Sequence, residues 1–301
     1  MMAIETTDLC RRFSRNEGLR HASLRVPKGS ALALIGANGA GKTTLLRILV
    51  NILRPTSGSA RVLDKDSRTL SAPDFNRIGY VAENQKLPER LSVERFFAYL
   101  RRLYPAWDGT LEESLRSGFD LPRSRHLAKL SHGMRMKVML TGALAFRPEL
   151  LILDEPLTGL DPLTRDEVID GLIGQAHDTT IVISSHEMSE VEGLATHVAY
   201  MDRGRLVFQE PTHDLLARFR HVTVTFRSLP PSIEQMPTSW LFEGASGRTL
   251  QFIEREFIGE EALKKTISES LGEVEHLGAD RMSLREVSKA LMTGSRREQA
   301  S

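Results

Sequence analysis

Short apolar runs alternate with helical stretches along the chain up to about Arg218. Strands are predicted at Ala31–Ile35, Ile78–Val81, Leu150–Asp154 and Thr180–Ser184. The last three runs are continuously apolar or β-branched, which is typical of buried strands in a mostly parallel sheet. Two shorter strands are expected at Val198–Met201 and Leu206–Phe208. This order of strands and helices indicates an α/β fold.

The hydrophobic pattern changes after Phe219. The segment His221–Arg227 alternates between apolar and polar residues and predicts a half-exposed strand. After a link that contains prolines, a hairpin is expected around Gly244–Gly247, and a helix at Glu260–Leu271. A second helix, Ser283–Leu291, starts with a Ser and has a Glu three residues later, which is a capping box. We therefore expect a first domain at 1–218 and a small α+β domain at 219–301.

Composition and charge narrow the function classes. The 301 residues are 41% hydrophobic and 26% charged, as in ordinary globular proteins, and the formal net charge is +1. This balance does not call for nucleic acid or an anionic membrane as a partner. The single cysteine, Cys10, suits a reducing compartment. The apolar runs are far shorter than the ~20 residues of a spanning helix, and the N-terminus lacks a secretory pattern. Any membrane pathway is therefore expected to come from another chain.

A phosphate-binding loop is the strongest chemical signal. It fits G-x-x-x-x-G-K-[ST] and comprises Gly36, Ala37, Asn38, Gly39, Ala40, Gly41, Lys42, Thr43 and Thr44. A predicted strand ends at Ile35, and an amphipathic helix begins at Thr43. Glycines let successive N–H groups turn toward one anion at a helix N-terminus. Lys42 would bind the β- and γ-phosphates and Thr43 would bind Mg²⁺. The alternative is a glycine-rich turn that happens to carry a lysine.

Two acids end the apolar strand Leu150–Asp154. Because ligands gather at the carboxyl ends of parallel strands, Asp154 and Glu155 are expected to face the phosphate loop. Asp154 would hold Mg²⁺ through water, and Glu155 would act as general base toward the attacking water. The alternative reading is a helix cap, because Asp-Glu-Pro often starts helices. The phosphate loop in the same chain favours the catalytic reading.

Three further segments complete a recognisable order: LSHGMR at 130–135, LTGLDP at 157–162 and SSHE at 184–187. The ordered set, from about Ile4 to Arg218, resembles the ATP-binding subunits of ABC transporters. The resemblance implies that Ser131, Gly133 and Met134 belong to the signature, and that Asp161 belongs to the D-loop. It also implies that His186 is the switch histidine, which bonds the γ-phosphate and the attacking water. In that family two copies sandwich two ATP molecules.

Several of these residues have plainer alternatives. The same resemblance implies that Phe13 stacks on adenine, although a core position is the alternative. Ser131 ahead of a helix is also an ordinary N-cap. An isolated histidine such as His186 is often structural.

Two motifs depart from the family pattern. His132 replaces the first signature glycine and Met134 replaces the usual glutamine. After the strand at 78–82 the family has a glutamine that contacts Mg²⁺ and water, but this chain has Glu83, with Gln85 two residues on. Our hypothesis is that Glu83, and not Gln85, fills this switch position as a catalytic and Mg²⁺-contacting residue.

The segment between the switch and the signature points to a membrane partner. Residues 84–146 correspond to the family's helical subdomain, where aromatic residues such as Phe96, Tyr99 and Tyr104 have helical spacing. Not all of them fit one stripe, so some are expected at the surface for docking, and simple packing is the alternative. The LYPAWD run at 103–108 and the acid at the switch resemble ATPases of ABC-2-type exporters.

The resemblance implies an exporter ATPase that uses ATP and Mg²⁺. Its expected partners are a polytopic permease on a separate chain and a second copy of itself, and no nucleic acid is expected. It would lie in the cytoplasm, peripheral on the inner face of the membrane. An importer ATPase is the nearest alternative. A soluble ABC ATPase that acts on ribosomes or nucleic acid is less favoured, because the chain has one phosphate loop and no coiled-coil heptads.

Overall fold

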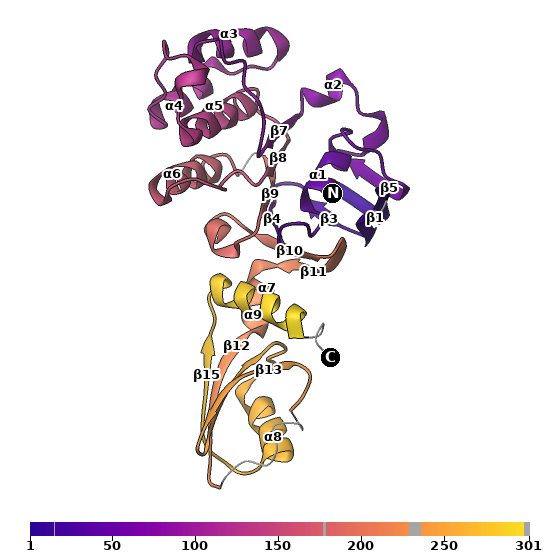
Figure 1. Cartoon of the computed structure of the whole chain (residues 1–301), viewed down its shortest axis with the longest axis vertical. Coiled ribbons are helices and arrows are strands. Elements are labelled where there is room, and N and C mark those ends of the chain that lie inside the picture. The colour runs from indigo at the N-terminus through magenta and orange to yellow at the C-terminus, as the bar shows by residue number, and fades with distance from the viewer. Residues whose placement is uncertain (15, 177–178, 229–235, 298–301) are drawn as a thin grey trace. The chain divides into compact units, whose positions relative to one another are not determined.

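The computed structural model describes residues 1–14, 16–176, 179–228 and 236–297. The chain divides into two compact units, Met1–Gln209 and Glu210–Ser301 (Figure 1). The predicted domain boundary, after residue 218, lies nine residues beyond the boundary between the two units, after residue 209 (218 − 209 = 9). The helix α7 (Thr212–Arg218), predicted in the first domain, therefore belongs to the second unit. Arg218 explains this, because its guanidinium donates to Glu210 at 2.6 Å and to the Arg255 carbonyl at 2.9 Å.

The central sheet of the first unit has the predicted α/β architecture. Its order among the described residues is β11-β10-β4-β9-β8-β7. The strands are β4 (Ala31–Ile35), β7 (Ile78–Ala82), β8 (Leu150–Asp154), β9 (Thr180–Ser185), β10 (His197–Asp202) and β11 (Arg205–Pro211). From β10 to β7 all neighbours run parallel. Every residue of β4 and β8 is buried, which accounts for their unbroken apolar runs.

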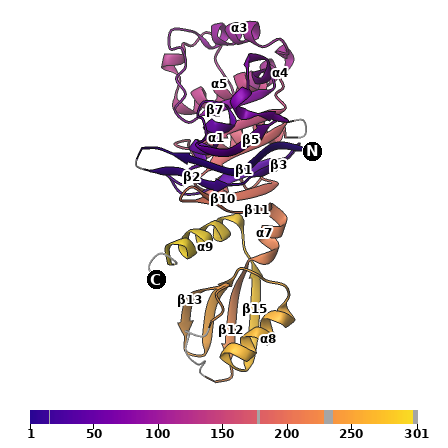
Figure 2. The same ribbon diagram turned by 90° about the vertical axis from the view of Figure 1, so that its right-hand side faces the viewer.

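A second, antiparallel sheet in this unit was not predicted. It comprises β1 (Met2–Arg12), β2 (Glu17–Ala22), β3 (Arg25–Pro27), β5 (Ser57–Val62) and β6 (Lys65–Asp66), with β1 paired to β2, β3 and β5 (Figure 2). Asp8 in β1 has a φ of 48°, and the pairing register shifts around it. This irregularity breaks the period-two pattern that would have predicted the strand.

The helix α1 (Lys42–Leu49) lies between the two sheets. Its Leu45 and Leu49 share one buried cluster with Ile4 and Val62 of the antiparallel sheet and with Ile152 of the parallel sheet. The helix that follows the phosphate loop is therefore packed against both sheets in one core.

Helices form a separate group beyond β7 and β8 (Figure 1). They are α3 (Val93–Leu103), α4 (Gly109–Gly118), α5 (His132–Leu144) and α6 (Pro162–Ile173), capped by Ser92, Asp108, Ser131 and Asp161. Shorter helices are α2 (Ala72–Phe75) and the 3₁₀ turns Ser67–Thr69, Leu127–Lys129 and Met188–Val191. Phe96 and Phe97 are buried, whereas Tyr99 and Leu103 are more than half exposed. The aromatic set is thus divided between core and surface.

The second unit is a four-stranded antiparallel sheet with helices. The strand order among its described residues is β13-β14-β12-β15, and all the pairs are antiparallel. The elements are β12 (Arg220–Phe226), β13 (Trp240–Ser246), β14 (Thr249–Glu254), α8 (Glu260–Leu271), β15 (Val274–Arg281) and α9 (Leu284–Arg297). Val224 and Phe226 pack with Ile267 of α8 on one face. The predicted capping box is present, because Ser283 and Glu286 exchange hydrogen bonds.

No helix among the described residues is long and apolar enough to cross a bilayer. The predicted link at 229–237 falls mostly outside those residues.

A buried carboxylate organises the helical group and gives a stability prediction. Glu112 is 2% exposed and accepts hydrogen bonds from Arg101 at 2.7 and 2.8 Å and from Trp107 Nε1 at 2.8 Å. Glu112→Ala leaves both donors without this acceptor, so we expect a loss of about 1–3 kcal/mol in the free energy of unfolding of this region. Because the chain has two tryptophans, urea unfolding is followed by Trp107 fluorescence in a Trp240→Phe background.

Glu94→Ala is the matched control. Glu94 also pairs with Arg101, at 3.5 Å, but both side chains are 41% exposed. Its removal is expected to cost less than about 1 kcal/mol. Equal losses in the two variants would contradict a central role for Glu112.

Candidate functional site

The phosphate loop joins β4 to α1 through a backbone that requires glycine. Gly39 and Gly41 have φ angles of 85° and 105°, in the left-handed region. A Cβ on Gly41 would lie 2.6 Å from the Gly18 carbonyl oxygen, and one on Gly36 would lie 2.3 Å from the Met201 carbonyl oxygen. These close approaches explain the glycines at positions 36 and 41.

A cavity of about 170 Å³ lies over this loop. It is lined by Gly18, Asn38, Gly39, Ala40, Gly41, Lys42, Thr43, Thr44, Glu83 and Glu155. The predicted residues Gly36 and Ala37 do not line it, and their carbonyls accept hydrogen bonds from Lys42 Nζ at 2.5 and 3.4 Å. The structure therefore brings the predicted loop together with both predicted glutamates.

Glu155 stands at the centre of a polar network. It follows β8 with a φ of 50° and is 7% exposed. Its Oε2 accepts hydrogen bonds from Thr158 Oγ1 at 2.9 Å and from His186 Nδ1 at 3.1 Å. Lys42 Nζ lies 3.0 Å from Oε1. Oε1 has no well-aligned hydrogen bond among the described residues, so this contact is an ion pair.

This network keeps Glu155 ionised. Burial raises its pKa, but the hydrogen bond from His186 and the adjacent positive charge of Lys42 outweigh burial, so its pKa lies below the ordinary value. An ionised carboxylate in the cavity can accept a proton from water.

Asp154 is held differently. It is 2% exposed, and its Oδ1 accepts hydrogen bonds from Thr43 Oγ1 and Ser184 Oγ, both at 3.0 Å. Ser184 Oγ also accepts a hydrogen bond from the backbone N–H of Glu155 at 2.8 Å. Burial raises the pKa of Asp154 above its ordinary value, and the two hydroxyl donors oppose that rise. Ser184 and Thr158 were not among the predicted site residues; Ser184 lies at the carboxyl end of β9, and Thr158 lies in the turn that follows β8.

The oxygen atoms at the loop suit Mg²⁺. No group of three or more His, Cys, Asp or Glu side chains in the described part of the chain is arranged to hold a metal alone. Mg²⁺ usually takes one or two carboxylates and completes its shell with water and substrate phosphates. Thr43, Asp154 and Glu83 supply hard oxygen donors of this kind.

The two switch candidates lie in different places. Glu83 lines the cavity, whereas the Gln85 side chain turns back and accepts a hydrogen bond from the Ala82 N–H at 3.3 Å. This arrangement favours Glu83, and its role stays a prediction.

Phe13 lies at the border of the cavity. The ring contacts Gly18, where an added Cβ would meet it at 2.6 Å, and the Arg11 guanidinium lies 4.8 Å from the ring centroid. Phe13 is 43% exposed, so the alternative core position is wrong. An exposed ring beside the cavity is available for stacking.

The signature and the D-loop form helix caps. Ser131 accepts a hydrogen bond from the Met134 N–H and starts α5, and Asp161 accepts one from the Thr164 N–H and starts α6. Among the described residues that line the cavity, none comes from the signature or is Asp161. Gly133 packs against Thr164, since a Cβ there would lie 2.7 Å from its methyl group. These residues therefore do not line the cavity over the chain's own phosphate loop.

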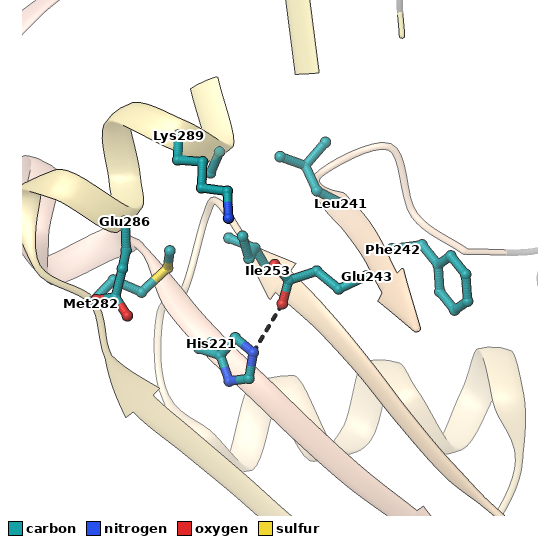
Figure 3. Close-up of a pocket in the computed structure, with 9 residues that line it drawn as sticks. His221, Leu241, Phe242, Glu243, Ile253, Met282, Glu286 and Lys289 are labelled. Atoms are coloured by element: carbon teal, nitrogen blue, oxygen red, sulfur yellow. Dashed lines mark ion pairs between the residues drawn. The ribbon is translucent and has the colours of Figure 1, made fainter. Parts of the chain in front are cut away.

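A cavity of about 400 Å³ lies in the second unit (Figure 3). In it His221 pairs with Glu243 at 2.8 Å, while Glu286 and Lys289 approach from α9. None of the predicted site residues lines it, so it is separate from the phosphate site.

Known proteins share this combination of fold and loop. The family model described as "ABC transporter" matches residues 19–158. The bacitracin transport ATP-binding protein BcrA of Enterococcus faecalis is 31% identical over 224 residues, which cover 73% of each chain. The chain belongs to the ABC transporter ATP-binding proteins.

Other proteins similar to this ABC ATPase include an import subunit. The methionine import ATP-binding protein MetN of Rhodopseudomonas palustris is 34% identical over 66% of this chain and 57% of that protein. A solved structure described as an ATP-binding subunit of an ABC transporter aligns with a TM-score of 0.65 and 26% identity, over 71% of this chain and 92% of that one. The similar proteins therefore include a subunit named for bacitracin transport and a subunit named for methionine import.

Ser184 gives a prediction about metal use and pH. Ser184→Ala removes a donor from Asp154, so the pKa of Asp154 rises further and less of the carboxylate is ionised at a given pH. We expect the Mg²⁺ concentration for half-maximal ATPase activity to rise about 10-fold, because a hydrogen bond to a charged group is worth about 1.5–3 kcal/mol. The acid limb of the rate should move to higher pH. Steady-state rates across Mg²⁺ concentration and pH measure both effects.

Thr179→Ala is the control, because its buried hydroxyl donates to the Pro148 carbonyl, away from the site. A pH profile that moves equally in both variants would show a general loss of structure instead.

Proposed function

We propose that this ABC ATPase powers a membrane exporter whose translocation pathway belongs to another chain. One observation carries the ATPase part of the proposal. The cavity over the phosphate loop contains Lys42 and the ionised Glu155 within 3.0 Å of each other, and Asp154 lies against Thr43. This is the combination that phosphoryl transfer to water needs: a phosphate cradle, a metal-binding carboxylate and a base.

The chain's own residues divide the chemistry. The loop N–H groups and Lys42 bind the phosphates of ATP. Glu155 takes the proton of the attacking water, and His186 holds the carboxylate through Nδ1 at 3.1 Å. Mg²⁺, when bound, neutralises charge on the phosphate oxygens, and Thr43 and Asp154 would hold it with Glu83 nearby. Phe13 would stack on the adenine.

A second copy is needed to complete the site. The N-terminus of α5, with Ser131 as its cap, carries the partial positive charge that binds anions. Because it does not line its own chain's cavity among the described residues, the phosphate it would serve belongs to another copy. Two copies would therefore close around two ATP molecules, with Asp161 near the seam.

Export is favoured over import by two features of the sequence: the LYPAWD run at 103–108 and the acid at position 83. The similarity to a bacitracin transport protein is in keeping with this choice. Tyr99 and Leu103, exposed on α3, offer an apolar surface to a permease segment. The protein would then lie in the cytoplasm on the inner face of the membrane. An importer ATPase remains the alternative, because a methionine import protein is also similar.

Purification from the native host tests the transport part. The full chain is tagged, membranes are solubilised in mild detergent, and co-purifying proteins are identified by mass spectrometry. We expect a polytopic membrane protein in near-equal amount. A Tyr99→Asp/Leu103→Asp double variant should lose that protein and keep its ATPase activity. Recovery of ribosomal or DNA-bound proteins instead would overturn the transport proposal and leave the ATPase chemistry intact.

A further inference from the structure

His132 occupies the place of a signature glycine, and its ring turns toward its own chain. Its Nε2 lies 3.1 Å from the carbonyl oxygen of Thr158, in the turn that follows β8. A carbonyl oxygen only accepts hydrogen bonds, so Nε2 carries the proton and donates. The ring also packs beside Gly159, where an added Cβ would lie 3.8 Å from two ring atoms. The histidine therefore ties the start of α5 to this turn.

The same turn holds the carboxylate of Glu155. Thr158 Oγ1 donates to Glu155 Oε2 at 2.9 Å, and the Thr158 N–H approaches the Glu155 carbonyl at 3.4 Å. Thr158 thus receives a hydrogen bond from the signature on its carbonyl and gives one to the glutamate from its hydroxyl. The result is a continuous path of two hydrogen bonds from His132 to Glu155.

Packing around this path fixes the two segments to each other. Gly133 lies against the Thr164 methyl group, and Lys137 of α5 forms an ion pair with Glu167 of α6. The N-terminal halves of α5 and α6 are therefore packed against each other. Glu155 itself has a left-handed φ of 50°, a conformation that persists only when its surroundings hold it.

We propose that His132 is a positioning residue, which holds the turn at Thr158 and thereby orients the Glu155 carboxylate toward water. The inference rests on the proposed function, since it requires Glu155 to be the base. In this proposal the signature segment acts at two nucleotide sites. Its helix N-terminus would bind the nucleotide of a second copy. His132, through its hydrogen bond to Thr158, would couple the position of that helix to the orientation of Glu155 in its own chain.

The test uses the full chain and two substitutions at His132. His132→Phe keeps the bulk of the ring and removes the donor, whereas His132→Gln keeps an N–H donor at similar reach. We expect His132→Phe to lower kcat about 3- to 10-fold, the range of one neutral hydrogen bond, and to leave KM for ATP within about twofold. His132→Gln should restore kcat to within about twofold of the original chain. An unchanged kcat in His132→Phe, or equal losses in both variants, would overturn the proposal.

A double-mutant cycle with Thr158→Val tests the path itself. Valine keeps the shape of threonine and removes the hydroxyl that bonds Glu155. Thr158→Val should lower kcat, because it removes the hydroxyl that donates to Glu155 Oε2. Adding His132→Phe to Thr158→Val should then change kcat little, because the path is already broken. Independent, multiplying effects would contradict a shared path.

A Glu155→Gln variant distinguishes a failure of the proposed function from a failure of the inference about His132. If that variant hydrolyses ATP at the original rate, the proposed function fails, and the role of His132 fails with it. If Glu155→Gln is inactive but His132→Phe is fully active, only the inference about His132 fails.

Discussion

Lys42 and Glu155 lie 3.0 Å apart at the end of the central sheet, with exposures of 5% and 7%. Such a pair is costly to separate, because removing one member leaves the other buried and uncompensated. Each member is held by a different part of the fold. Lys42 starts α1, which is packed between the two sheets, and Glu155 directly follows β8 in a left-handed conformation. The sheet order β4-β9-β8 brings the two elements to the same edge. The geometry of the phosphate cavity depends on this contact between Lys42 and Glu155.

The common direction of the strands also explains why a few residues are enough to form the site. In a parallel sheet all carboxyl ends point the same way, so the residues just beyond β8 and β9 converge with the phosphate loop. Asp154 ends β8 and Glu155 follows it, and Ser184 and His186 come from β9 and the residues after it. Ser184 joins the two acids by donating to Asp154 and accepting from the Glu155 N–H. One strand end therefore holds the two acids in fixed relative positions.

Local pattern predicted the parallel sheet, the phosphate loop and the two acids, because each depends on residues that adjoin in sequence. The bounds of β4, β8 and α8 agree with the prediction residue for residue. The antiparallel sheet was missed because Asp8 interrupts the alternation of β1. Thr158 and Ser184 were missed because a hydroxyl residue carries no distinctive spacing, and its role appears only when two strand ends meet. The direction of the His132 ring was likewise invisible, since it depends on where α5 lies beside the turn at Gly159.

Nucleotide retention by a Glu155→Gln chain tests the central claim most directly. The full-length variant is incubated with Mg²⁺ and ATP, separated from free nucleotide, and measured for turnover, bound ATP and molecular mass, with Lys42→Ala beside it. The account predicts a fall in turnover of about 10²- to 10⁴-fold, the usual contribution of a general base, with unhydrolysed ATP retained in a species of doubled mass. Lys42→Ala should retain no nucleotide. Turnover at the original rate in Glu155→Gln would contradict the account.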